Sequence, residues 1–87
     1  MVSRVLTVMN EEGFHIRTAA ALAGAMGRYP CRVSIIFNGN EYDAKSTLNI
    51  VTACIKCGND FELVCDGEQE AEALETAVDL IQTGLSA

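Results

Sequence analysis

His15 is the only histidine of the chain and stands among residues that favour covalent chemistry at an imidazole. Gly13 precedes it by two positions and Arg17 follows it by two. A neutral imidazole is a nucleophile near pH 7. The planar donor array of a guanidinium group matches the oxygens of a phosphoryl group. These residue types suit nucleophilic chemistry at His15, with Arg17 as a donor to phosphoryl oxygens; the alternative is a helix-end or core histidine without chemistry, which is the more common role of a lone histidine.

The segment that follows His15 predicts a helix over residues 16–26, because it is rich in alanine and its apolar residues have helical spacing. Gly27 and Pro30 end this helix. A helix N-terminus offers unpaired N–H groups and a partial positive charge, which suit a bound phosphate and favour a neutral imidazole. Gly13 allows the backbone to bend sharply before the site.

The cysteines offer a second kind of chemistry. Cys54 and Cys57 form a C-x-x-C motif, which is found in redox sites and as half of a metal site. Zinc needs four ligands at usable spacing, and the sequence contains no second C-x-x-C and no H-x-H. We therefore interpret the cysteines as small buried or half-buried structural residues rather than as a redox or metal site. We expect no metal, no cofactor and no disulfide scaffold.

The other elements follow from periodicity and turn residues. Alternation predicts strands over residues 2–8, 32–37, 41–44 and 60–66. Turns are expected at residues 10–13, 38–39 and 58–59. Ser46 is the expected N-cap of a short helix over residues 47–53. A longer helix is expected over residues 68–83, with a buried stripe made of Ala71, Leu74, Val78, Ile81 and Leu85.

This β-α-β-β-α-β-α order predicts an α+β fold. The simplest arrangement of these elements is an open-faced β-sandwich, in which one four-stranded antiparallel sheet carries the three helices on one face. The length fits a single domain over residues 1–87. It is short for a deep enclosed active site.

Charge and hydropathy exclude several function classes. The net charge is −6, and the acids concentrate after residue 40. The sequence has no basic stripe with aromatic residues and no tryptophan, so we do not expect nucleic-acid binding. It has no apolar run long enough to insert in a membrane and no secretion signal at its start. We expect a cytoplasmic protein.

Two segments resemble a known family. The residues Gly13-Phe14-His15-Ile16-Arg17, followed by Ala19-Ala20, resemble the G-L-H-x-R-P-A-A segment of the phosphocarrier protein HPr family of the bacterial phosphoenolpyruvate-dependent sugar phosphotransferase system. Residues 44–48 resemble that family's A-K-S-hydrophobic segment. The resemblance covers about residues 2 to 85, with the same element order.

The resemblance implies a phosphoryl carrier with a transient phosphohistidine rather than a stand-alone enzyme. His15 would accept the phosphoryl group from Enzyme I on Nδ1 and donate it to an EIIA domain of a sugar permease. Arg17 would contact the phosphoryl oxygens. Such a transfer needs mainly positioning and charge stabilisation.

Ser46 has two interpretations, and so do the residues expected to dock partners. Ser46 is either an N-cap alone or also a regulatory phosphorylation site for an HPr kinase/phosphorylase. The residues expected to dock partners beside His15 are Ala20, Thr47, Leu48 and Val51. The alternative to docking is a structural role: Ala20 would favour the helix, and Leu48 and Val51 would be buried in the core.

The sequence departs from the family at Thr18, where the family usually has proline. The threonine hydroxyl either contacts phosphate or leaves the helix start looser. Gly24, Gly27 and Asn49 stand where the family has lysines, which leaves Arg17, Arg28 and Lys45 as basic groups. Electrostatic steering toward acidic partners is therefore weaker.

Two other functions remain open from the sequence. One is a regulatory docking module of the same fold, in carbon or nitrogen control, with Ser46 as its switch. The other is a thiol or metal protein built on Cys54 and Cys57. The sequence does not identify the sugar or regulatory branch served, the phosphorylation of Ser46 or the oligomeric state.

Overall fold

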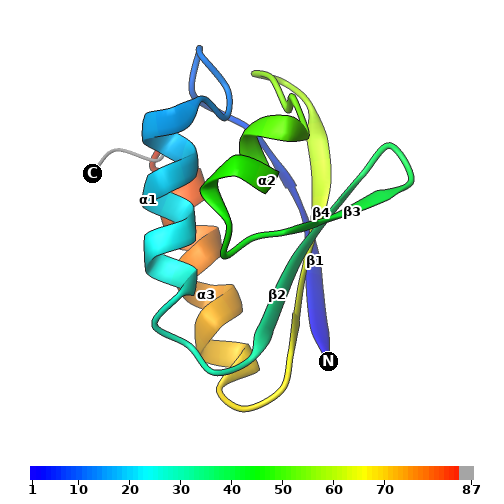
Figure 1. The fold of residues 1–87 in the computed structure, drawn as a ribbon, viewed down its shortest axis with the longest axis vertical. Helices are drawn as coiled ribbons and strands as arrows, with labels where there is room; N and C mark the ends of the chain where they lie inside the picture. Colours follow the sequence, from blue (N-terminus) through cyan, green and yellow to red (C-terminus); the bar gives the residue numbers. More distant parts are fainter. Residues whose placement is uncertain (85–87) are drawn as a thin grey trace.

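The computed structural model describes residues 1–84. Its elements are β1 (Val2–Thr7), α1 (Ile16–Met26), β2 (Arg32–Phe37), β3 (Asn40–Asp43), α2 (Thr47–Thr52), β4 (Asp60–Asp66) and α3 (Glu70–Gln82) (Figure 1). The predicted element order is confirmed. Within the described residues, no helix is long and apolar enough to cross a membrane.

The four strands form one antiparallel sheet in the order β1-β4-β2-β3. The register pairs Leu6 with Phe61 and Val33 with Cys65, so β4 is held by a neighbour on each side. The three helices cover one face of this open sheet, as Figure 1 shows. The predicted α+β open-faced sandwich is thus confirmed.

The core lies between the sheet and the helices. The sheet contributes its inward-facing side chains, which are Leu6, Val33, Ile35, Phe61, Leu63 and Cys65. The helices contribute mainly Leu22, Met26, Ile50, Val78 and Ile81. Full burial of one large aliphatic side chain contributes roughly 1.5–3 kcal/mol, so this layer is the main force that holds α1 and α2 in place.

The hairpin turn is the expected one, and it shifts the third strand by one residue. Asn38 and Gly39 both have positive φ, 52° and 79°, as a type I′ turn requires. A two-residue loop of this kind places its flanking residues opposite each other, so β3 begins at Asn40 rather than at residue 41. Ala44 lies beyond the strand and is buried.

The predicted start of the last helix is wrong by two residues. Gly67 has φ 129° and Gln69 has φ 63°, and such left-handed positions cannot belong to a right-handed helix. The helix α3 therefore begins at Glu70. The Glu70 carboxylate accepts hydrogen bonds from the Gly67 N–H and from the N-terminal ammonium group.

The buried face of α3 also differs from the prediction. Val78 and Ile81 are buried as expected, but Ala71 is exposed and Leu74 is only half-buried. Ala73 and Ala77 lie at the centre of the buried face instead, where their small side chains allow close packing of the helix. Leu85 lies outside the described residues.

Candidate functional site

The loop between β1 and α1 is fixed by its contact with residues 55–57. Gly13 has φ 68°, and a Cβ atom added there would lie 2.5 Å from the Ile55 carbonyl oxygen. The Phe14 N–H donates to the same carbonyl at 3.0 Å, and the Phe14 ring packs edge-on against Phe61. Only glycine fits this close approach, so Gly13 sets the direction in which the chain enters His15.

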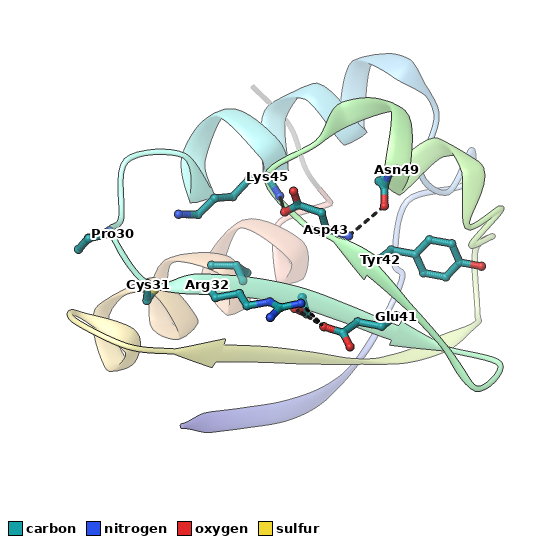
Figure 2. Close-up of a pocket in the computed structure, with 10 residues that line it drawn as sticks. Pro30, Cys31, Arg32, Glu41, Tyr42, Asp43, Lys45 and Asn49 are labelled. Carbon is teal, nitrogen blue, oxygen red and sulfur yellow. Dashed lines mark hydrogen bonds and ion pairs between the residues drawn. The ribbon is translucent and has the colours of Figure 1, made fainter.

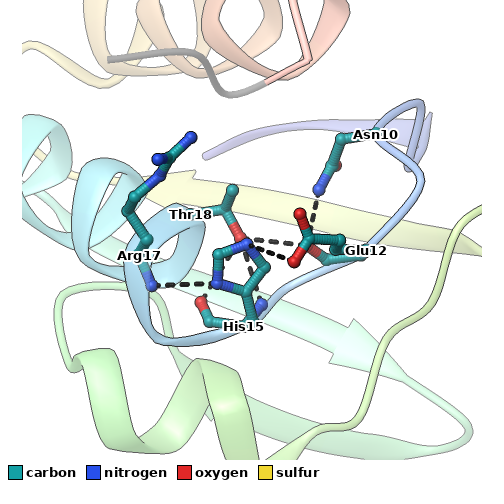
Figure 3. A network of polar contacts seen from close by, with 6 residues as sticks. Asn10, Glu12, His15, Arg17 and Thr18 are labelled. Atoms are coloured by element: carbon teal, nitrogen blue, oxygen red, sulfur yellow. Dashed lines mark hydrogen bonds and ion pairs between the residues drawn. The ribbon is translucent and has the colours of Figure 1, made fainter.

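His15 is the N-cap residue of α1. Its backbone is extended, with φ −104° and ψ −177°, and its carbonyl accepts the first helical hydrogen bond from the Ala19 N–H at 2.8 Å. Its Nδ1 accepts a hydrogen bond from the Arg17 N–H at 3.2 Å (Figure 3). An imidazole nitrogen thus takes the place that a serine or aspartate oxygen usually has at a helix N-terminus.

Thr18 completes this cap. Its hydroxyl accepts a hydrogen bond from the His15 N–H at 3.1 Å and donates to the Gly13 carbonyl at 2.9 Å. The side chain is buried, with 5% exposed. The hydroxyl points inward and holds the start of the helix, which contradicts the interpretation of a looser start. Its contact with phosphate stays a prediction.

The hydrogen bond at Nδ1 identifies the tautomer of the ring. Because Nδ1 accepts a hydrogen bond, it carries no proton, and the proton of the neutral imidazole is on Nε2. Nε2 lies 3.5 Å from Oε2 of Glu12 (Figure 3). The His15 side chain is 35% exposed and that of Glu12 is 78% exposed. The sequence analysis missed Glu12, for which the three-residue spacing before His15 was the available signal.

Arg17 reaches the ring only through its backbone. Figure 3 shows its guanidinium directed away from the imidazole. The side chain is exposed and forms no ion pair within the described part of the chain. Its contact with a phosphoryl group therefore stays a prediction that needs a rotation of the side chain.

Ser46 is the N-cap of α2, as predicted. Its Oγ accepts a hydrogen bond from the Asn49 N–H at 3.3 Å, and its carbonyl accepts from the Ile50 N–H. The side chain is half-buried. The cap interpretation is thus confirmed, whereas its phosphorylation stays a prediction.

Comparisons with known proteins agree with this arrangement. The family model described as "PTS HPr component phosphorylation site" matches residues 2–83. The phosphocarrier protein HPr of Pseudomonas aeruginosa is 39% identical over 77 residues, which cover 87% of this chain and 86% of that protein. The chain belongs to the HPr family. A second relative, the phosphocarrier protein HPr of Treponema pallidum, is 30% identical over 82 residues, which cover 94% of this chain and 93% of that protein.

Solved structures of the HPr family have the same fold. The crystal structure of HPr-C-His from Thermoanaerobacter tengcongensis aligns with a TM-score of 0.94 at 26% identity, over 98% of this chain and 96% of that one. A phosphocarrier protein HPr from Bacillus anthracis aligns with a TM-score of 0.88 at 26% identity, over 93% and 96%. The family expected from the two sequence segments is thereby confirmed.

The residues expected to dock partners of this HPr-family chain lie on α1 and α2, which pack against each other. Ala20 and Leu48 are exposed, and Thr47 and Val51 are half-buried. Leu48 is 75% exposed, so its interpretation as a core residue is wrong; Ile50 supplies the core contact of α2. Ile16, in the first turn of α1, is a further exposed apolar residue, with 67% of it exposed, and it was not among the residues expected to dock partners.

One of the three basic groups, Lys45, is hydrogen-bonded within the fold. Lys45 Nζ donates to the Tyr29 carbonyl at 2.6 Å, while Arg17 and Arg28 are exposed. Lys45 also lines a pocket of about 520 Å³ with Arg32 and Glu41, which form an ion pair (Figure 2). This pocket is lined by residues between positions 30 and 49, so it does not include the His15 loop.

The four cysteines form two pairs with different exposure. Cys54 and Cys57, the surface thiol pair, are exposed, and Cys31 and Cys65, the buried thiol pair, are in the core. All four are free thiols. The expectation of burial is thus wrong for the surface thiol pair, because Cys54 has φ 56° and Ile55 turns inward instead. The described residues include no group of three or more His, Cys, Asp or Glu side chains that could hold a metal ion.

Proposed function

We propose that this chain accepts a phosphoryl group from Enzyme I on Nδ1 of His15 and donates it to an EIIA domain of the sugar phosphotransferase system. Family membership supports the reaction class. The observation that carries the assignment of the atom is the position of Nδ1, unprotonated and 3.2 Å from an N–H group at the N-terminus of α1. We place this exchange in the cytoplasm, where the proposed partners act.

The resting hydrogen bond of Nδ1 has a second use in the transfer. The lone pair that accepts the Arg17 N–H must turn to the phosphorus atom, and breaking such a hydrogen bond costs about 1 kcal/mol. The N–P bond to His15 forms as the N–P bond of the donor breaks. The Arg17 N–H is then free to donate to a phosphoryl oxygen, in the place where helix N-termini bind anions.

The side chain of Arg17 adds a second donor. It is exposed and makes no competing ion pair among the described residues, so it can rotate to the phosphoryl group when a partner approaches. A hydrogen bond to a charged group contributes about 1.5–3 kcal/mol, which corresponds to roughly ten- to hundredfold in rate when it forms only during transfer.

Labelled phosphoenolpyruvate with a competent Enzyme I tests the proposal. We expect one acid-labile phosphate per chain, none on His15→Ala, and slower labelling of Arg17→Gln. Arg4→Gln is the matched control, because Arg4 is exposed on β1 and forms no ion pair among the described residues. An unlabelled wild-type chain would refute the carrier function.

A regulatory docking module of the same fold is the second candidate. The HPr-like protein Crh of Bacillus subtilis is 28% identical over 94% of this chain, and a solution structure described as that of a catabolite repression HPr aligns with a TM-score of 0.68. Ser46 caps α2 beside the exposed Leu48. Labelling by an HPr kinase/phosphorylase and ATP that is lost in Ser46→Ala and kept in His15→Ala would support this candidate.

A further inference from the structure

We infer that Glu12 is a positioning residue for His15: its carboxylate holds the imidazole proton on Nε2 and so keeps Nδ1 as the nucleophile. The inference deepens the proposed function and rests on it. The geometry comes from one short segment, in which the Glu12 Oε2 atom faces Nε2 at 3.5 Å and the Arg17 N–H faces Nδ1 at 3.2 Å (Figure 3). The two ring nitrogens therefore meet opposite kinds of partner.

The two contacts select the same tautomer. A backbone N–H can only donate, so it is compatible with an unprotonated Nδ1; a carboxylate can only accept, so it is compatible with a protonated Nε2. In the other tautomer, two N–H groups would face each other at one nitrogen, and a lone pair would face a carboxylate at the other. The sequence places the carboxylate in a turn closed by the hydrogen bond from the Gly13 N–H to the Asn10 carbonyl.

The carboxylate also matches the charge that develops during transfer. As Nδ1 forms its bond to phosphorus and the bond to the donor breaks, the ring gains a positive charge while the Nε2 proton stays in place. Glu12 lies at the Nε2 edge of the ring, where it offsets that charge without occupying the side on which the phosphoryl group arrives. A carboxylate that orients a histidine and stabilises its cation works by the same principle in hydrolases.

The expected size of the effect is small, because Glu12 is 78% exposed and 3.5 Å exceeds the length of a strong hydrogen bond. Exposed ion pairs change an equilibrium by about two- to fivefold. They weaken at high salt. The Glu12 contribution should therefore be measured at low ionic strength.

Nitrogen NMR of the imidazole tests the inference without any partner protein. His15 is the only histidine, so its two ring nitrogens can be assigned without ambiguity. At alkaline pH we expect the wild-type ring to carry its proton mainly on Nε2, and the ratio of tautomers to fall by about two- to fivefold in Glu12→Ala. The tautomer ratio should fall less in Glu12→Gln, because the amide oxygen of glutamine still accepts a hydrogen bond from Nε2–H.

Glu11→Ala is the matched control, since Glu11 is exposed in the same turn and makes no ion pair or side-chain hydrogen bond among the described residues. An unchanged tautomer ratio in Glu12→Ala overturns the inference, and so does an equal change in Glu11→Ala. The phosphoryl transfer rate gives the second readout: kcat with Enzyme I should fall about two- to fivefold in Glu12→Ala with KM unchanged. An unlabelled wild type refutes the proposed function alone, whereas a labelled Glu12→Ala with wild-type kcat and tautomer ratio refutes the inference alone.

Discussion

Replacing Thr18 by valine should destabilise the helix start without changing its shape. Valine has nearly the volume of threonine, so the change removes the hydroxyl and leaves the packing of a 5% exposed side chain intact. The hydroxyl loses the hydrogen bond that it accepts from the His15 N–H and the one that it donates to the Gly13 carbonyl at 2.9 Å, with a weaker second contact to the His15 carbonyl at 3.3 Å. The His15 N–H, a part-buried donor, is left without a partner, whereas the Gly13 carbonyl keeps the hydrogen bond that Asn10 Nδ2 donates at 2.6 Å.

The magnitude follows from the His15 N–H, which loses its partner. A buried polar group left without a partner costs about 1–3 kcal/mol, and loss of a side-chain cap at a helix N-terminus costs about 1 kcal/mol. The hydroxyl contact of 3.3 Å to the His15 carbonyl adds little, because that carbonyl also accepts from the Ala19 N–H at 2.8 Å. We expect the free energy of unfolding of Thr18→Val to fall by about 1–2 kcal/mol, which lowers Tm by roughly 5–15 °C in a domain of this size.

Thermal and urea unfolding measure this change, and Thr7→Val is the matched control. Thr7 is exposed on β1, and its hydroxyl donates to the Asp60 carboxylate at 2.5 Å on the surface. Its replacement should lower the free energy of unfolding by less than Thr18→Val does, because the exposed Asp60 carboxylate is hydrated when the hydroxyl is removed. Thr18→Ser keeps the hydroxyl, so its loss in the free energy of unfolding should lie between those of Thr18→Val and Thr7→Val. Equal Tm values for Thr18→Val and Thr7→Val would refute the capping role of Thr18.

Four further outcomes follow from the structure. Gly13→Ala should lower the free energy of unfolding by more than about 2 kcal/mol in urea titration, because it combines a positive φ with a backbone clash. Ser46→Ala should cost about 1 kcal/mol by the same method, whereas Ser46→Asp should keep the cap and stay near the wild type. A thiol reagent should titrate two of the four cysteines in the folded chain and all four in denaturant, since burial raises the pKa of Cys65 to about 11. The N-terminal ammonium and the Gly67 N–H hold the pKa of Glu70 below its ordinary 4.5; this stabilisation is present above that value and lost as pH falls through the lowered pKa, so the Tm difference between wild type and Glu70→Gln should shrink in acid.

Most of the fold could be predicted from periodicity and turn residues. The boundaries of α1 and of the strands β2 and β4 agree with the prediction because alternation or helical spacing changes abruptly there. Errors arose where the signal is weak. Alanine is tolerated both at the surface and in the core, so spacing could not tell that Ala73 is buried and Ala71 exposed. The left-handed Gln69 before α3 has no sequence signature.

The site was predictable in its residues but not in its contacts. Ser46 occupies the N-cap position predicted for it, and His15, which directly precedes the helix predicted over residues 16–26, is also an N-cap. The inward hydroxyl of Thr18 depends on the φ of 68° at Gly13, which brings the Gly13 carbonyl toward α1. This contact depends on the backbone conformation of the loop, so it could not be predicted from the residue types alone.

The backbone and the ring of His15 are held with very different strength. The backbone is fixed by Gly13 packed on residues 55–57, by the hydrogen bond from the Phe14 N–H to Ile55 and by the buried hydroxyl of Thr18. Among residues 1–84, the polar contacts of the ring are those at Nδ1 and Nε2, of 3.2 and 3.5 Å, and its side chain is 35% exposed. A carrier needs this separation, because a ring bound tightly in one state would have to give up that stabilisation at each transfer. In the proposed carrier, the backbone contacts therefore fix the position of His15, while the free energy of the phosphoryl bond is left to the imidazole and its partners.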